Sequence, residues 1–198
     1  MPLKVTLVGS RFFGAAVLDK LVTLDVQVLQ VVAPGADDRL AVRAQALGIP
    51  MRVQHDPRQV PAAEIADGTE LIVAAHTHAR VMDDALAKAR LGGIGYHPSL
   101  LPRHRGIAAV EWTVKCGDPI AGGSIYHLAD RMDAGAIAAQ AWCFVKPGES
   151  ARELWERALA PLGIRLLTQV VAQASASGRL PAQPQDEQFA TLAPRQNV

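Results

Sequence analysis

The sequence predicts an α/β fold in which a mixed, mainly parallel sheet carries helices on both faces. Short apolar runs recur through the first half of the chain, apolar residues at helical spacing follow them, and glycine and proline separate the two patterns. Strands that alternate with helices form parallel sheets, because each helix returns the chain to the edge from which the next strand starts. Ligands of such sheets bind beyond the carboxyl ends of the strands.

Strands and helices alternate along the first half of the chain. The apolar runs that predict strands are residues 3–8, 26–32, 71–75 and 94–97. The segments whose apolar spacing predicts helices are residues 13–21, 40–47 and 80–90. Breakers separate the elements, because Pro34 and Gly35 end the second strand and Gly48 closes the second helix.

The pattern changes in the second half, where two strands follow one another directly. The predicted elements are a helix at residues 107–114, strands at 124–128 and 136–145, and a long amphipathic helix over 154–170. The strands flank a turn at residues 129–135, and residues 147–150 form a turn and cap before the long helix. This pair of strands is the reason to predict a mixed sheet.

Length and composition describe one ordinary globular domain followed by a tail. The chain has 198 residues, of which 49% are hydrophobic and 20% charged. Residues 1–176 are predicted to form the domain. Residues 177–198 are rich in Ala, Gln and Pro and lack periodicity, which predicts a loosely packed or extended C-terminal tail.

Charge and cysteine content exclude several classes of protein. The 20 basic and 19 acidic residues nearly cancel, so nothing favours nucleic acid or an anionic membrane as a partner. Cys116 and Cys143 make neither a zinc site nor a disulfide framework. No apolar stretch reaches the length of a membrane span, and the N-terminus reads as a strand rather than a signal peptide. We therefore expect a cytoplasmic protein.

The segment from Tyr96 to Gly106 carries the first candidate catalytic residue, His97. This histidine ends a predicted strand, and the two prolines that follow leave the loop few conformations, so the imidazole is held before a substrate arrives. Asp133, in the turn between two predicted strands, is the candidate partner, and Asp130 is a competing carboxylate. Such a pair suits acid/base chemistry, whereas a structural histidine and an ordinary turn aspartate are the alternatives.

Two further patterns suggest other chemistry. Residues 9–14, Gly-Ser-Arg-Phe-Phe-Gly, lie between a strand and a helix as a dinucleotide-binding loop does, which would indicate an NAD-dependent oxidoreductase. Arg11 occupies the place of the middle glycine of that motif, so a tight strand-to-helix turn is favoured. His76 and His78 look like a metal-ligand pair, but no nearby carboxylate or cysteine completes a set, and no metal is predicted.

The run His-Pro-Ser-Leu-Leu-Pro at residues 97–102 is followed by Arg-Gly at 105–106 and by Asp-Ala-Gly at 133–135. This combination resembles the N-terminal domain of folate-dependent formyltransferases and hydrolases, which implies a Rossmann-like formyltransferase fold. It also implies an enzyme that transfers the formyl group of 10-formyltetrahydrofolate to a small amine or to water. Under this resemblance His97 matches the catalytic histidine and Asp133 the essential aspartate.

The resemblance also implies a folate-binding site. The residues that it assigns to the folate are Ala79, Arg80, Val81, Ser99, Leu100, Leu101, Pro102 and Asp130. The Leu101–Pro102 bond is often cis in relatives. The implied partners are the folate donor and a small-molecule acceptor or water, with no nucleic acid, membrane or metal. Whether the chain forms a homo-oligomer is left open.

One departure from the family's pattern affects the reaction. Most transferases of the family have Asn two residues before the histidine, where this chain has Gly95. That Asn helps to polarise the formyl oxygen, and loss of one such donor costs about 10²–10³ in rate in other enzymes. The motif most resembles the hydrolase domain of 10-formyltetrahydrofolate dehydrogenase, which also lacks the Asn. Hydrolysis, transfer to a small amine and a non-catalytic folate-binding homologue all stay open.

Overall fold

The computed structural model describes residues 1–195, which form two compact units. The first unit consists of Met1–Gly95 and Thr168–Leu180. The second unit consists of Tyr96–Leu167 and the tail from Pro181 onward. Each unit therefore joins segments that are distant in the sequence, and each is described by itself.

The first unit is built on parallel strands. Its strands are β1 (Leu3–Gly9), β2 (Val26–Ala33), β3 (Met51–Val53), β5 (Leu71–Ala75) and β7 (Gly93–His97), of which the last two residues belong to the second unit. They lie in the order β3-β2-β1-β5-β7, and each pair is parallel. A separate parallel pair joins β4 (Gln59–Val60) to β6 (Arg80–Val81). The mainly parallel arrangement is confirmed.

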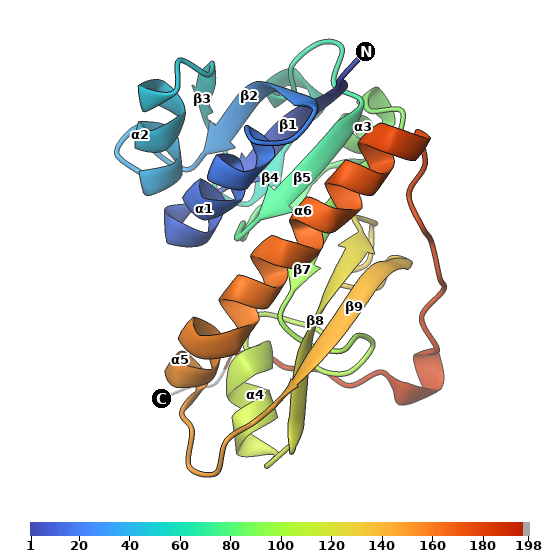
Figure 1. Ribbon diagram of the computed structural model, residues 1–198. Helices are drawn as coiled ribbons and strands as arrows, with labels where there is room; N and C mark the ends of the chain where they lie inside the picture. The colour runs from blue at the N-terminus through green and yellow to red at the C-terminus, as the bar shows by residue number, and fades with distance from the viewer. Residues whose placement is uncertain (196–198) are drawn as a thin grey trace. The chain divides into compact units, whose positions relative to one another are not determined.

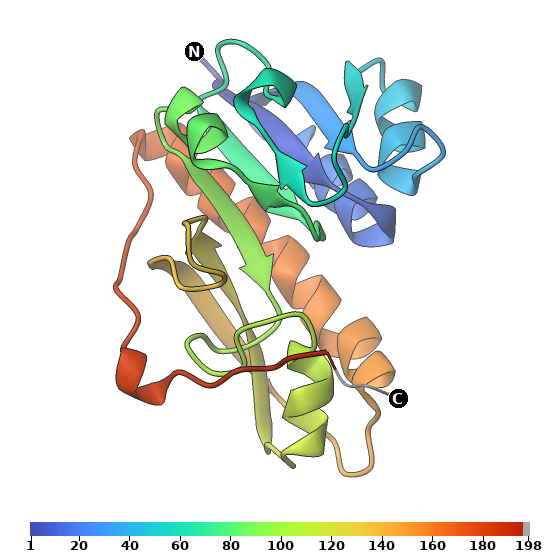
Figure 2. The same cartoon turned by 180° about the vertical axis from the view of Figure 1, so that it is seen from behind.

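Helices cover both faces of these strands, as predicted. The helical elements of the first unit are α1 (Arg11–Leu21), α2 (Arg39–Ala46), the short 3-10 helix η1 (Ala62–Glu64), α3 (Asp83–Lys88) and the end of α6 (Ala160–Ser177). Figure 1 shows α1 and the end of α6 in front of the strands, and Figure 2, seen from behind, shows α3 on the opposite face. Both faces of β1 and β5 are therefore buried, which explains their continuous apolar runs.

Gly9, at the end of β1, lies against the backbone of β5. A Cβ atom on Gly9 would fall well inside van der Waals distance of the Ala75 carbonyl oxygen, which is itself close to the Ser10 N–H at 3.2 Å. We expect Gly9→Ala to lower the free energy of unfolding by about 1–3 kcal/mol, because backbone has to move. Urea unfolding measures it, with Gly48→Asn as the control. Gly48 has φ +67° and open space around it, so an equal loss in both variants would contradict this packing argument.

The second unit holds an antiparallel pair of strands and helices at its ends. Its elements are α4 (Ala109–Lys115), β8 (Ile120–His127), β9 (Ile137–Phe144), α5 (Ala151–Leu154), the π-helical turn η2 (Trp155–Leu159), the start of α6 and the 3-10 helix η3 (Glu187–Phe189). Strands β8 and β9 pair antiparallel. Ser150 and Glu153 form a capping box at the start of α5. The chain then continues from α5 through η2 into α6, where the sequence predicts one long helix.

Several elements differ from the sequence-based prediction. The helix predicted over residues 80–90 begins as strand β6 and is helical only from Asp83 to Lys88, because Arg80 and Val81 pair with β4. Strands β3 and β4, of three and two residues, are absent from the prediction, because runs this short carry no periodicity. Strand β8 begins at Ile120 rather than at 124, because Gly122 and Gly123 pair with β9 instead of forming a loop.

The C-terminal tail is extended. Gln183 forms an antiparallel bridge with Ile137, and Leu192 a parallel bridge with Arg105. The domain boundary at residue 176 stays a prediction. Over residues 1–195, no helix combines the length and apolar character that crossing a membrane requires.

Candidate active site

His97 is the last residue of strand β7, its side chain is buried, and one of its ring nitrogens is engaged in a hydrogen bond. The residue is 6% exposed, and its Nε2 lies 2.7 Å from the carbonyl oxygen of His104. A carbonyl oxygen only accepts, so Nε2 carries a hydrogen and donates it. In the neutral ring the other nitrogen, Nδ1, is therefore an acceptor. The tautomer of the neutral ring is fixed by the backbone of the following loop.

Asp133 faces that second nitrogen. Its Oδ2 lies 3.6 Å from His97 Nδ1 and accepts a hydrogen bond of 2.8 Å from the Gly106 N–H, and the residue is 8% exposed. The 3.6 Å separation is an ion-pair distance and too long for a hydrogen bond, so Nδ1 makes no direct hydrogen bond to the carboxylate. The backbone of Asp133 has φ +52°, a left-handed conformation that Asp tolerates and that recurs at functional sites.

Tyr126, near the end of β8, contacts both members of the pair. Its ring stands edge-on to the His97 ring, with centroids 6.4 Å apart, and its hydroxyl interacts electrostatically with the Asp133 carboxylate. Burial, together with the Asp133 charge, raises the pKa of Tyr126 well above its ordinary value, so the hydroxyl stays protonated. Tyr126 is not among the candidate residues expected from the sequence. The available signal was a phenol near the end of a predicted strand that leads into the Asp133 turn.

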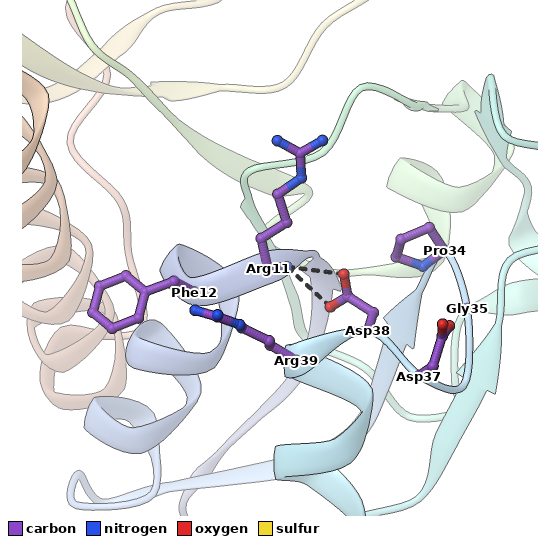
Figure 3. A pocket seen from close by; sticks show the side chains of 7 residues that line it. All are labelled: Arg11, Phe12, Pro34, Gly35, Asp37, Asp38 and Arg39. Carbon is purple, nitrogen blue, oxygen red and sulfur yellow. Dashed lines mark hydrogen bonds between the residues drawn. The ribbon is translucent and has the colours of Figure 1, made fainter. Parts of the chain in front are cut away.

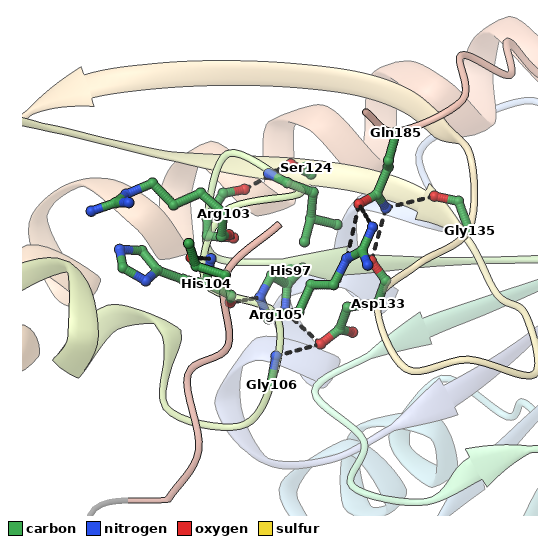
Figure 4. A network of polar contacts seen from close by, with 12 residues as sticks. His97, Arg103, His104, Arg105, Gly106, Ser124, Asp133, Gly135 and Gln185 are labelled. Carbon is green, nitrogen blue, oxygen red and sulfur yellow. Dashed lines mark hydrogen bonds and ion pairs between the residues drawn. The ribbon is translucent and has the colours of Figure 1, made fainter. Parts of the chain in front are cut away.

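The loop after His97 is held by hydrogen bonds from the side chains of three residues. Ser99 Oγ donates to the Arg103 carbonyl (2.6 Å), and Ser124 Oγ donates to the Ser99 carbonyl (2.7 Å) and accepts from the Leu101 N–H (3.0 Å). Gln140 Nε2 donates to the Leu101 carbonyl (2.9 Å). The Leu101–Pro102 peptide bond is cis. Figure 4 shows this polar network around His97.

His104, whose carbonyl accepts the hydrogen bond from His97 Nε2, is itself held in place by hydrogen bonds. Its N–H donates to Thr191 Oγ1 (2.8 Å), and its Nε2 lies 2.8 Å from the Asp118 carboxylate. Arg103 donates to the same carboxylate at 2.6 and 2.9 Å, and its guanidinium holds the pKa of Asp118 below the usual value. The residue whose carbonyl accepts from His97 is thus held through its side chain by a carboxylate whose pKa is lowered.

The remaining predicted residues lie in several places. Ser99, Leu100, Leu101 and Pro102 belong to the loop described above. Asp130 is exposed, and within residues 1–195 its carboxylate accepts only from the Arg131 N–H, at 2.7 Å. The geometry therefore favours Asp133 as the partner of His97. Gly95 lies in β7, paired with Ala74.

Ala79, Arg80 and Val81 belong to the first unit, at strand β6. The Ala79 N–H donates to Thr77 Oγ1 at 3.1 Å, and the Arg80 N–H to the Arg58 carbonyl at 2.8 Å. A ligand that bonded to this strand would therefore meet backbone groups other than these two N–H groups.

The glycine-containing loop after β1 opens onto a pocket of about 620 Å³ in the first unit (Figure 3). Arg11, with φ +58°, donates its N–H to both oxygens of the Asp38 carboxylate, at 2.9 and 3.1 Å. An internal carboxylate thus occupies the N-terminal amide of α1 that a pyrophosphate would need. This contact disfavours the dinucleotide-binding interpretation.

The two histidines considered as metal ligands interact with each other. The rings of His76 and His78 stand edge-on with centroids 5.4 Å apart, and Ser10 Oγ lies 3.0 Å from His76 Nδ1. Burial lowers the pKa of His76, and the neighbouring His78 adds to the shift. No group of three or more His, Cys, Asp or Glu side chains placed to hold a metal occurs within residues 1–195.

Comparisons with known proteins agree with each other. The sequence profile of the family described as formyl transferase matches residues 4–171. Mitochondrial 10-formyltetrahydrofolate dehydrogenase of Mus musculus is 36% identical over 200 residues, covering 96% of this chain and 22% of that protein. Methionyl-tRNA formyltransferase of Lactobacillus delbrueckii subsp. bulgaricus is 30% identical over 202 residues, covering 96% and 64%. The chain thus spans about a fifth of the length of the first of these relatives.

The fold is similar to that of solved structures. The crystal structure of phosphoribosylglycinamide formyltransferase from Anaplasma phagocytophilum superposes with a TM-score of 0.77 at 23% identity, covering 98% of this chain and all of that one. At this level of identity the likeness concerns the fold alone.

Proposed function

The chain belongs to the formyl transferase family, and on this premise we propose that it takes the formyl group from 10-formyltetrahydrofolate and delivers it to a small amine or to water. The observation that carries the proposal is the buried pair of His97 and Asp133, 3.6 Å apart, in which Nε2 donates to the His104 carbonyl and Nδ1 faces the carboxylate. The cytoplasmic location and the absence of a nucleic-acid partner belong to the same proposal.

The site fits the chemistry of formyl transfer. A formyl group on nitrogen is a carbonyl whose oxygen gains negative charge when a nucleophile adds, and the folate nitrogen needs a proton to leave. Imidazolium Nδ1–H of His97 supplies a donor for either atom, because Nε2–H is already engaged with the His104 carbonyl. Since the loop fixes the ring before substrate binds, little reorganisation remains for the reaction itself.

Asp133 performs two tasks in this proposal. Its carboxylate faces Nδ1 at 3.6 Å, where it stabilises positive charge that develops on the ring during the reaction. Through a water molecule it also accepts the proton of the attacking amine or water. A hydrogen bond from the Gly106 N–H holds the carboxylate while it does so. Asp133 is proposed as a catalytic residue because it touches the reacting groups through that water.

Residues for the folate are proposed from the family's pattern. Ser99–Pro102 and the turn that contains Asp130, all in the second unit, would contact the donor. The hydrogen bonds of Ser124 and Gln140 that fix the Ser99–Pro102 backbone support this proposal, because a rigid loop loses little entropy on binding.

The acceptor is the open part of the proposal. Gly95 supplies no side-chain amide to polarise the formyl oxygen. The missing amide favours hydrolysis, or a water molecule that takes the place of the amide. A non-catalytic folate-binding homologue is the alternative that Gly95 also favours. The intact pair of His97 and Asp133 weighs against it.

Incubation with 10-formyltetrahydrofolate separates these outcomes. We expect tetrahydrofolate to appear, and its rate is measured with and without a panel of small amines. Release without an amine identifies a hydrolase, and amine-dependent release identifies a transferase. Binding of the folate without any release, measured by calorimetry, would contradict the enzyme assignment and favour the non-catalytic homologue.

A further inference from the structure

The side chain of Gln185, in the C-terminal tail, makes four hydrogen bonds in the second unit. Its Oε1 accepts from Arg105 Nε (3.1 Å) and Nη2 (2.6 Å), and its Nε2 donates to the carbonyl oxygens of Asp133 (2.8 Å) and Gly135 (2.7 Å). Figure 4 shows the amide lying between the Arg105 guanidinium and the Asp133 turn. One side chain of the tail therefore touches both loops of the candidate site.

The orientation of this amide follows from chemistry. A guanidinium only donates and a carbonyl oxygen only accepts, so Oε1 has to face Arg105 and Nε2 has to face the turn. Both donors and both acceptor sites of a primary amide are then used. Glu, Met or Leu lacks this combination, since none of them presents two donors and an acceptor from one planar group.

Arg105, which Gln185 contacts, is itself held by several further hydrogen bonds. The residue is 5% exposed, and its guanidinium also bonds Glu187 at 2.8 and 3.0 Å. Its backbone N–H donates to the Thr191 carbonyl (2.8 Å), and its carbonyl accepts from the Ala193 N–H (2.6 Å). The loop is thus held at residue 105 by the tail on both its backbone and its side chain.

The residues on either side of Arg105, and the turn that Gln185 holds, contact His97 and Asp133. His104, directly before Arg105, provides the carbonyl that orients His97, and Gly106, directly after it, donates to Asp133 Oδ2. On the other side, Gln185 holds the carbonyl of Asp133 itself, a residue with left-handed backbone. The separation between His97 and Asp133 is therefore set by a closed ring of contacts through Gln185.

We propose that Gln185 is a positioning residue of the formyl-transfer site, which keeps the Asp133 carboxylate facing His97 Nδ1 by joining the Asp133 turn to the Arg105 loop. The inference rests on the proposed function. It assigns a role in the reaction to the C-terminal tail, and it predicts that loss of the two Nε2 donors lowers kcat more than it changes KM. Displacement of a catalytic group by about 1 Å costs about 100-fold in rate.

Gln185→Met and Gln185→Glu test the proposal. Met removes all four bonds, whereas Glu keeps the acceptor for Arg105 and loses both donors to the turn. Gln183→Met and Gln183→Glu are the matched controls, because Gln183 is exposed and is held to Ile137 by backbone bonds. We expect kcat to fall about 10- to 100-fold in both Gln185 variants with KM within about threefold. The Gln183 variants should keep the parent values.

Amide hydrogen exchange at Gly106, followed by NMR, gives a readout independent of activity. Because this N–H bonds Asp133 Oδ2, its protection should drop about tenfold or more in the Gln185 variants while the helices of the second unit keep theirs. Unchanged kcat and unchanged Gly106 protection would overturn the proposal, and so would an equal loss of protection across the unit. If the parent protein releases no tetrahydrofolate, the proposed function fails, and the exchange at Gly106 still decides whether Gln185 positions Asp133.

Discussion

Turnover of 10-formyltetrahydrofolate is expected to fall about 10²–10⁴-fold when His97 is replaced by Gln. The amide can still donate to the His104 carbonyl, as Nε2 of the imidazole does, so the loop keeps its anchor. What disappears is Nδ1, the ring nitrogen that faces Asp133 and that we propose to carry the transferred proton. The expected loss is therefore in kcat, with binding of the folate retained.

His127→Gln is the matched control for this experiment. His127 is partly buried in the same unit, and its Nε2 bonds the Pro181 carbonyl at 2.8 Å. The substitution therefore removes an imidazole that also bonds a backbone carbonyl but does not belong to the His97–Asp133 pair. Steady-state kinetics and folate titration on both variants make the comparison. A His97→Gln enzyme with a rate near that of the parent would show that the imidazole is structural.

Asp133→Asn is expected to lower kcat about 100-fold or more. The amide has the size of the carboxylate and Asn adopts left-handed backbone readily, so the turn at φ +52° is preserved. The amide oxygen still accepts from Gly106 N–H, but the negative charge that faces His97 and the base for the attacking nucleophile are gone. The variant thus removes chemistry and keeps geometry.

Asp130→Asn provides the control for the carboxylate. Asp130 lies three residues earlier in the same turn, is exposed and accepts from the Arg131 N–H. Because Asp130 lies in the turn that we propose to contact the folate, we expect this variant to raise KM for the folate and to keep kcat within about threefold of the parent value. If Asp130→Asn lost the activity and Asp133→Asn kept it, the assignment of the partner to His97 would be wrong.

The long strands and helices could be predicted from the sequence because burial imposes periodicity on them. β1, β2, β5 and α1 show it over five or more residues. Strands β4 and β6 exist only because two short segments pair across twenty residues, and neither segment carries a pattern of its own. Tertiary pairing also converts the start of the predicted helix at residue 80 into a strand.

The candidate pair could also be predicted from the sequence, but its surroundings could not. His97 precedes a proline-flanked motif, and Asp133 stands in a turn between strands, so both are visible as local features. The tautomer of His97 depends on a carbonyl seven residues away, and the position of Asp133 depends on Gln185, 52 residues further along the chain. A glutamine in a segment without periodicity gives no sign of such contacts before the fold brings them together.

The most direct test of the account is a double-mutant cycle on His97 and Asp133. kcat/KM for release of tetrahydrofolate from 10-formyltetrahydrofolate is measured for the parent, His97→Gln, Asp133→Asn and the double variant. Groups that act as one acid/base unit lose most of their effect together, so the double variant should lie within about threefold of the slower single variant. Losses that multiply, with each substitution acting independently of the other, would contradict a joint role for the two residues.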